Sequence, residues 1–341
     1  MAANTGQKGP DDHWLSMRQE DVLEPELPII DAHHHLWVRG GYTYLMPEFA
    51  DDLASGHNIL ATVYAECHSM YRKDGPAEQR SIGETEFVRG QAAMSASGGF
   101  GPARACDVMF GNVDLTLGQA VGPILADHVE ASGGRFRGVR ISTGWHEDSR
   151  VGNVAQEPRS LLDPRVNDAV SVLKNLGISL DCWLYHTQLD EVAQLADRHP
   201  ELTIILNHVG SPILGGPYRG KSDQVFRVWK AAVQSVSERQ NVFVKLGAMP
   251  IRLSDYQGDR TLPPCSEEVA AAWRPWMDTC IEAFGPSRAM YESNFPVQKR
   301  WCSYQVCWNA FKRISAGASP SEKTDLFSGA AARAYRMTID Q

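Results

Sequence analysis

Three consecutive histidines follow a short apolar segment near the start of the chain, and their spacing suits metal chemistry. The segment Pro-Ile-Ile leads through Asp31 into His33, His34 and His35. In an extended strand alternate side chains share a face, so we expect His33 and His35 to point together and His34 to point away. Two neutral imidazoles on one face form a chelating pair for a divalent cation. A polar strand end contacting solvent is the alternative, but Asp-x-His-x-His after an apolar strand favours a metal-binding or catalytic role.

The composition of the 341-residue chain is that of an ordinary soluble globular protein, with 43% hydrophobic and 22% charged residues. The net charge of -8 argues against nucleic acid or an anionic membrane as a partner. The sequence has no run of 18 apolar residues, and residues 1–28 lack the apolar region of a secretory signal, so we expect a cytoplasmic protein. The seven scattered cysteines are expected to be free, mostly buried thiols.

Short β-rich segments alternate with amphipathic ones along the chain. The eight expected strands are residues 29–32, 59–65, 104–110, 136–141, 178–184, 203–206, 242–246 and 289–291. The expected helices are residues 83–96, 165–176, 189–198, 224–238 and 267–284. Strand–helix alternation implies parallel strands, and eight such units predict an α/β protein with a (β/α)₈ TIM barrel. We expect one barrel domain, residues 29–337, with an N-terminal extension, residues 1–28.

Polar residues gather where the expected strands end. They are His33 and His35, Glu66 and His68, Arg140, Tyr185 and His186, Asn207 and His208, Lys245, and Glu292 and Asn294. In a barrel these positions converge on the carboxyl end, where catalysis takes place in this architecture. Taken singly, Arg140 or Lys245 could be a solvated strand end and His68 a loop cap. The remaining histidines are interpreted as structural or surface residues: His13, His57, His128, His146 and His199.

From residue 28 to 337 the chain resembles the amidohydrolase superfamily, in its amidohydrolase-related, lactonase-like branch. The resemblance is carried by the motifs at residues 31–37 (DAHHHLW), 205–210 (ILNHVG), 243–246 (FVKL) and 291–296 (YESNFP). It implies a TIM-barrel, metal-dependent hydrolase with one divalent ion, zinc or manganese. On this resemblance His33, His35 and His186 are the metal ligands, and His208 polarises the substrate or the attacking water.

The chain departs from the family pattern after the last strand. The family has Ser-Asp-Trp-Pro where this chain has Ser-Asn-Phe-Pro, with Asn294 replacing the aspartate. An amide cannot act as a general base near neutral pH, and it is a weaker metal ligand than a carboxylate, so metal binding could be weak. Glu292, two residues earlier, or Glu66 could supply the missing carboxylate. The alternative role for Glu292 is a structural ion pair with Arg140 or Lys245.

These residues predict a hydrolase of a small organic substrate, a lactone or cyclic ester. Arg140 and Lys245 suggest that the substrate carries an anionic group, because guanidinium binds carboxylates in a bidentate manner. Tyr185 and His68 are expected to be further substrate contacts. One alternative is a non-oxidative, metal-dependent decarboxylase of an aromatic or unsaturated acid. Another is a ligand-binding barrel without catalysis, which the Asn294 change supports. Assembly into a homo-oligomer is left open.

Overall fold

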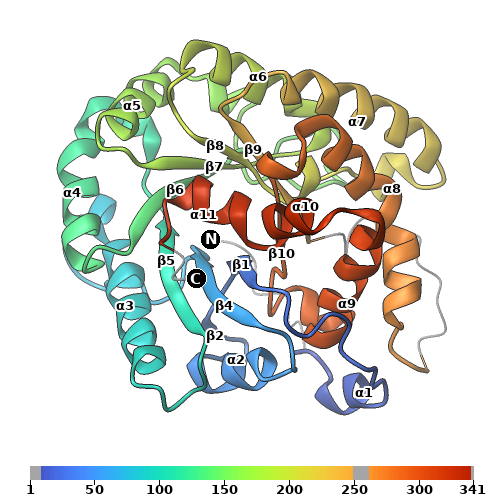
Figure 1. The fold of residues 1–341 in the computed structure, drawn as a ribbon. Coiled ribbons are helices and arrows are strands. Elements are labelled where there is room, and N and C mark those ends of the chain that lie inside the picture. Colours follow the sequence, from blue (N-terminus) through green and yellow to red (C-terminus); the bar gives the residue numbers. More distant parts are fainter. Residues whose placement is uncertain (1–8, 249–260, 339–341) are drawn as a thin grey trace.

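Eight parallel strands form one sheet in the order β1-β4-β5-β6-β7-β8-β9-β10 in the computed structural model, which describes residues 9–248 and 261–338 (Figure 1). The strands are β1 (Ile29–His34), β4 (Ile59–Ala65), β5 (Arg104–Gly111), β6 (Phe136–Ser142), β7 (Ser179–Trp183), β8 (Ile204–Leu206), β9 (Val242–Gly247) and β10 (Ala289–Glu292). Each expected strand is therefore present, and the predicted (β/α)₈ barrel is confirmed.

The sheet closes into a barrel at the seam between β1 and the turn that follows β10. Asn294 N donates to His33 O at 2.8 Å, and His35 N donates to Phe295 O at 2.7 Å. A parallel bridge between His34 and Phe295 completes the seam. The seam thus fixes the histidine motif of the first strand beside the residues that follow the last one.

Helices surround the sheet (Figure 1). They are α2 (Met46–Leu53), α3 (Ile82–Ala96), α4 (Val121–Ala131), α5 (Pro164–Asn175), α6 (Leu189–Arg198), α7 (Ser222–Ser237), α8 (Ser266–Phe284) and α9 (Tyr304–Ile314). Glycines end two of them as the sequence indicates, since Gly177 after α5 has φ 65° and Gly285 after α8 has φ 75°. The sequence did not predict the hairpin of β2 (Trp37–Arg39) and β3 (Tyr42–Tyr44), because three-residue strands carry too little periodicity.

Three short α-helices lie near the two ends of the described chain. Helix α1 (Asp12–Ser16) precedes β1, and its segment packs on α9, where Asn309 accepts from Leu23 N at 2.9 Å. Helix α10 (Pro320–Thr324) leads through a π-helical turn, Asp325–Gly329, into α11 (Ala330–Tyr335). Helix α11 lies across one end of the barrel in Figure 1. It covers the amino ends of the strands, where Arg336 Nη2 donates to Arg137 O at 3.1 Å.

The barrel interior is apolar at the α11 end and polar at the other. Alanines 330, 331 and 334 pack with inward-facing residues of the strands, among them Ile30, Val63 and Phe110. The Tyr335 ring stacks on Phe110 at 5.9 Å, and its hydroxyl donates to Asp181 at 2.8 Å. Tyr335 therefore links the apolar plug to the charged layer above it.

The structure also bears on the state of the cysteines and on membrane-spanning helices. All seven cysteines are free, and six of them are buried, as the sequence predicted. Within residues 9–248 and 261–338, the helices are too short or too polar to span a bilayer.

We predict that Tyr335→Phe lowers the free energy of unfolding by about 1–3 kcal/mol, because the buried Asp181 carboxylate loses a hydrogen-bond donor. Chemical denaturation measures this change. Tyr42→Phe, on the half-buried β3 strand, is the control and should change stability by less than about 0.5 kcal/mol. Equal stabilities for the two variants would show that the Tyr335 hydroxyl contributes nothing to the barrel.

Candidate active site

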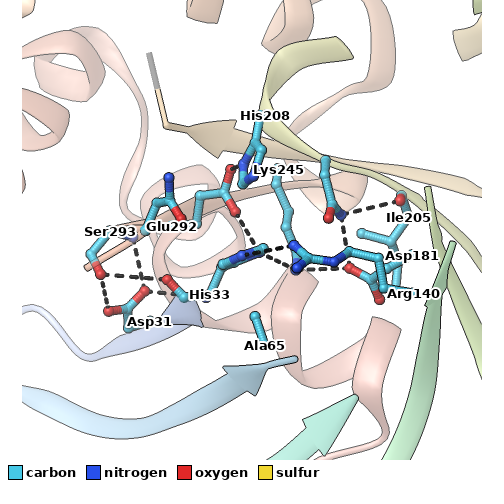
Figure 2. A network of polar contacts seen from close by, with 12 residues as sticks. Asp31, His33, Ala65, Arg140, Asp181, Ile205, His208, Lys245, Glu292 and Ser293 are labelled. Atoms are coloured by element: carbon cyan, nitrogen blue, oxygen red, sulfur yellow. Dashed lines mark hydrogen bonds and ion pairs between the residues drawn. The ribbon is translucent and has the colours of Figure 1, made fainter. Parts of the chain in front are cut away.

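The carboxyl end of the barrel, which we call the mouth, brings together several of the polar residues predicted at the strand ends: His33, Arg140, His208, Lys245 and Glu292 (Figure 2). His33 and His35 lie on one side, with their Nε2 atoms 3.3 Å apart. The His34 ring points away and stacks on Phe49 outside the strands, at 4.2 Å between ring centroids. The predicted alternation of the three histidines is confirmed. The pairing of β1 with β4 is irregular between Asp31 and His34, within this same segment.

Asp31 fixes the seam beneath the histidines. Its buried carboxylate accepts from Ser293 N at 2.9 Å, from Ser293 Oγ at 2.5 Å and from Tyr304 OH at 2.9 Å. Burial raises the pKa of this carboxyl to about 6, against the lowering effect of the donors from Ser293. Asp31 thus holds β1 and the end of β10 in one register.

The two cations of the site are paired with carboxylates of the protein. Arg140 Nε donates to Glu66 Oε1 at 2.6 Å, and its Nη2 donates to Glu66 O at 2.5 Å. Lys245 Nζ lies 2.8 Å from Asp181 Oδ1, and both side chains are fully buried. Burial lowers the pKa of the Lys245 ammonium, and the Asp181 charge opposes this shift. The carboxylates in these two ion pairs are Glu66 and Asp181, and not Glu292 as the alternative interpretation predicted.

Glu292 instead bridges two imidazoles. Its Oε1 lies 2.6 Å from His208 Nδ1, and its Oε2 lies 3.1 Å from His33 Nδ1 (Figure 2). The carboxylate has space because residue 247 is glycine: a Cβ there would lie 2.4 Å from Glu292 Cγ and 2.2 Å from Glu292 O. The glycine at the end of β9 is therefore part of the site, although the sequence analysis assigned it no role.

Hydrogen bonds define which nitrogen of His35 carries the proton. His35 Nδ1 lies 2.8 Å from Ala65 O, and a carbonyl only accepts, so Nδ1 is the donor. Burial holds the pKa of His35 well below its usual range, which makes the ring neutral. Its Nε2 is therefore an unprotonated lone pair. This lone pair faces His33 Nε2 at 3.3 Å and Asn294 Oδ1 at 3.2 Å.

His33 is also neutral, because burial and the Lys245 charge keep its pKa well below normal. Its Nδ1 lies 3.1 Å from the Lys245 ammonium, which only donates, and 3.1 Å from Glu292 Oε2, a buried oxygen without a hydrogen-bond partner among the described residues. A cation at Nε2 would require the ring proton on Nδ1, on the side of Glu292.

Three possible ligand atoms converge: His33 Nε2, His35 Nε2 and Asn294 Oδ1. Two ligands about 2.0–2.1 Å from one tetrahedral ion lie about 3.3 Å apart, which matches the two distances at His35 Nε2. The donor Arg140 Nη1 approaches His33 Nε2 only to 3.4 Å. These residues fit a divalent cation, and the Glu292–His33 contact is the type of carboxylate support that metal-binding imidazoles have.

A second grouping of possible ligands shares His33. Its Nδ1 side, His208 and Glu292 offer ligand atoms within 4.8 Å of one another. The proton between His208 Nδ1 and Glu292 Oε1, 2.6 Å apart, and the nearby Lys245 ammonium both oppose a cation there. The Arg140 guanidinium is farther from Nε2, at 3.4 Å, than Lys245 Nζ is from Nδ1, at 3.1 Å, so we favour the Nε2 side of His33 for a cation.

Backbone strain marks the same region. His68, His208 and Asn294 adopt left-handed conformations with φ of 59°, 56° and 54°. Such conformations are uncommon outside glycine and gather at functional sites. They occur where the chain leaves β4, β8 and β10 to enter the loops of the mouth.

Three predicted site residues lie in other surroundings. His186 Nδ1 accepts from Ile213 N at 3.3 Å, and its ring contacts Tyr218. Its contacts with the described residues do not include His33 or His35. Tyr185 OH donates to Gly152 O at 2.6 Å and so ties down a loop. The His68 side chain is 65% exposed, contacts Tyr71 OH at 3.0 Å and has its Nε2 3.8 Å from Glu66 Oε2. Their roles as metal ligand and substrate contacts stay predictions.

We predict that Gly247→Ala lowers kcat by about 10²-fold, because the added methyl group displaces Glu292 from the two imidazoles. Steady-state kinetics with the best substrate measures the loss. Gly317→Ala is the control, since a Cβ there meets no atom within 4 Å. Wild-type turnover by a folded Gly247→Ala protein would contradict the assigned position of Glu292.

The chain is similar in sequence to known proteins. The profile described as amidohydrolase matches residues 30–337. A Sinorhizobium fredii protein, uncharacterized protein y4mH, is 30% identical over 334 residues, which span 92% of this chain and 99% of that protein. The L-fucono-1,5-lactonase of Burkholderia multivorans is 25% identical over 319 residues, 90% of this chain and 96% of the lactonase.

A solved structure has the same architecture. The crystal structure of an amidohydrolase from Burkholderia multivorans with bound zinc aligns with a TM-score of 0.69 and 23% identity. The alignment covers 91% of this chain and 99% of that one. Since the family profile spans nearly the whole barrel, the chain belongs to the amidohydrolase family.

Proposed function

We propose that this protein hydrolyses a lactone. The observation that carries the proposal is the Glu292–His208 pair, 2.6 Å apart, beside the convergent ligand atoms of His33, His35 and Asn294. An imidazole oriented by a carboxylate is a general base, and a carbonyl-polarising position next to it completes the requirements for ester hydrolysis. Similarity to the L-fucono-1,5-lactonase supports a cyclic ester.

His208 acts as the base in this proposal. Its Nδ1–H donates to Glu292, so in the neutral ring Nε2 carries the lone pair, and the side chain keeps 11% of its surface exposed. His208 Nε2 takes a proton from water as the water oxygen attacks the lactone carbonyl carbon. Collapse of the tetrahedral oxyanion breaks the ring C–O bond, and His208 returns the proton to the leaving alkoxide. The product is a hydroxy acid. Glu292 orients His208 and stabilises its protonated form.

His33, His35 and Asn294 would hold a divalent metal, zinc or manganese, whose contribution is to polarise the lactone carbonyl. The Asn294 amide gives this ligand set less negative charge than the aspartate of related sequences, so we propose weak binding. Arg140, with Nη1 directed at His33 Nε2, stands beside the same position. His186 is not needed in this ligand set.

The ion pairs of Arg140 with Glu66 and of Lys245 with Asp181 bear on the choice of substrate. Glu66 and Asp181 already neutralise these two cations, so neither is a free receptor for a substrate carboxylate. We therefore favour a lactone without an anionic group over the anionic one that the sequence suggested. A decarboxylase acts on an acid and needs such a receptor, and carbon dioxide release from aromatic acids would reveal it.

We predict that His33→Ala/His35→Ala removes bound metal, because both Nε2 ligands are lost. Elemental mass spectrometry of protein purified without chelator measures the metal content per chain. His34→Gln is the matched control, since His34 faces Phe49 and Thr62 and should affect stability but not metal content. Full activity of wild-type protein after chelation, with no metal detected, would remove the metal from the account.

We predict that Glu292→Gln and His208→Ala each lower kcat for lactone hydrolysis by about 10²–10⁴, the range for general base catalysis. Because the two residues act as one unit, the double variant should lose no more than the worse single variant. Proton release from a panel of lactones at constant pH measures turnover. Near-wild-type turnover by Glu292→Gln would exclude the pair and direct attention to Glu66.

A further inference from the structure

A second polar cluster lies at the barrel mouth, outside the pair and ligand set described above. It consists of His146, His186 and Tyr218, which come from the loops that follow β6, β7 and β8. The Tyr218 ring meets both imidazoles edge to face, with centroid distances of 5.5 Å to His146 and 5.4 Å to His186. His186 N donates to Ser211 O at 3.2 Å, which places this cluster next to the loop that carries His208.

Backbone donors fix the proton positions in this cluster. Asp148 N donates to His146 Nδ1 at 2.9 Å, so the neutral ring carries its proton on Nε2. His146 Nε2 lies 3.0 Å from Tyr218 OH and therefore donates to it. The Tyr218 hydroxyl accepts that bond, and its own proton is left to donate elsewhere.

His186 is organised in the same way. Ile213 N donates to His186 Nδ1 at 3.3 Å, so Nε2 carries the proton of the neutral ring. Burial lowers the pKa of His186 to about 4, which keeps the ring neutral in ordinary buffers. The residue is 3% exposed, and its ring is held within the described residues through the bond at Nδ1, which leaves Nε2–H available to a ligand. Two neutral donors, on Tyr218 and His186, are thus available side by side.

We propose that Tyr218 and His186 form a substrate subsite that binds a neutral oxygen, a ring hydroxyl of a polyhydroxylated lactone. Each donor has a proton that the described residues leave available, so a ligand oxygen that accepts from both gains affinity and selectivity. A carboxylate suits the position less well. Glu147 and Asp148 contribute negative charge near Tyr218, and the nearby Arg150 is already paired with Asp148 at 2.6 Å.

The subsite gives a role to three residues that the sequence analysis placed elsewhere or left aside. His186 becomes a substrate donor rather than a metal ligand, and His146 a positioning residue for the Tyr218 hydroxyl. The inference rests on the proposed lactone hydrolysis, since it names the substrate class of that same site. Its test therefore includes a ligand that binds without reacting.

Binding is measured by calorimetry with a 1,5-anhydrohexitol, a cyclic ether that has the ring hydroxyls but no ester. Tyr218→Phe removes one donor. His186→Asn removes the other, while its amide oxygen can still accept from Ile213 N. We expect each variant to weaken binding about three- to tenfold, the effect of one hydrogen bond. Tyr42→Phe is the control and should bind as the wild type does, and thermal unfolding confirms that each variant is folded.

Kinetics supplies the second readout. The ratio of kcat/KM for an aldono-1,5-lactone to that for δ-valerolactone, which lacks hydroxyls, should fall about three- to tenfold in Tyr218→Phe and His186→Asn. The subsite is excluded if both lactones lose rate equally or if the anhydrohexitol binds both variants like the wild type. It is also excluded if the wild type prefers a carboxylated lactone and Tyr218→Phe abolishes that preference. Weakened anhydrohexitol binding without turnover of any lactone would support the subsite and refute the hydrolase.

Discussion

The closure of the barrel between β1 and β10 is the constraint on which the site depends. Two backbone hydrogen bonds, from Asn294 N to His33 O and from His35 N to Phe295 O, bring the first and last strands together. The buried Asp31 carboxylate, shared by Ser293 and Tyr304, sets their register. A slip of one residue would turn the histidine pair out of the barrel, because side chains alternate along a strand. The residues that we propose as metal ligands and catalytic groups are therefore positioned by the same bonds that close the fold.

Within that frame, charge balance decides what each group can do. Asp181 neutralises Lys245, Glu66 neutralises Arg140, and Glu292 is left to the two imidazoles of His33 and His208. An unpaired charge at this depth would be costly, so the pairing stabilises the polar layer above the apolar plug. The same pairing leaves neither Arg140 nor Lys245 as a free cation, and this is why we favour a neutral substrate. In our proposal, neutral donors in the loops then recognise it.

The sequence predicted the parts of this account that depend on local pattern. Strand–helix alternation gave the barrel, and the alternation of His33, His34 and His35 gave their orientation correctly. The role of Gly247 was not foreseen, because its importance lies in the space left for Glu292, a residue far away in the sequence. The partners of Arg140 and His186 were not foreseen either, because they lie on other strands and loops. His146 is an ordinary loop histidine until the fold brings Tyr218 against it.

Anomalous diffraction from crystals grown with manganese or zinc tests the central claim most directly, because it locates a bound ion without reference to activity. The account predicts one peak within about 2.0–2.2 Å of His33 Nε2, His35 Nε2 and Asn294 Oδ1. His186 should lie outside the bonding distance of that ion. A peak held by His208 and Glu292, or one bonded to His186, would contradict it.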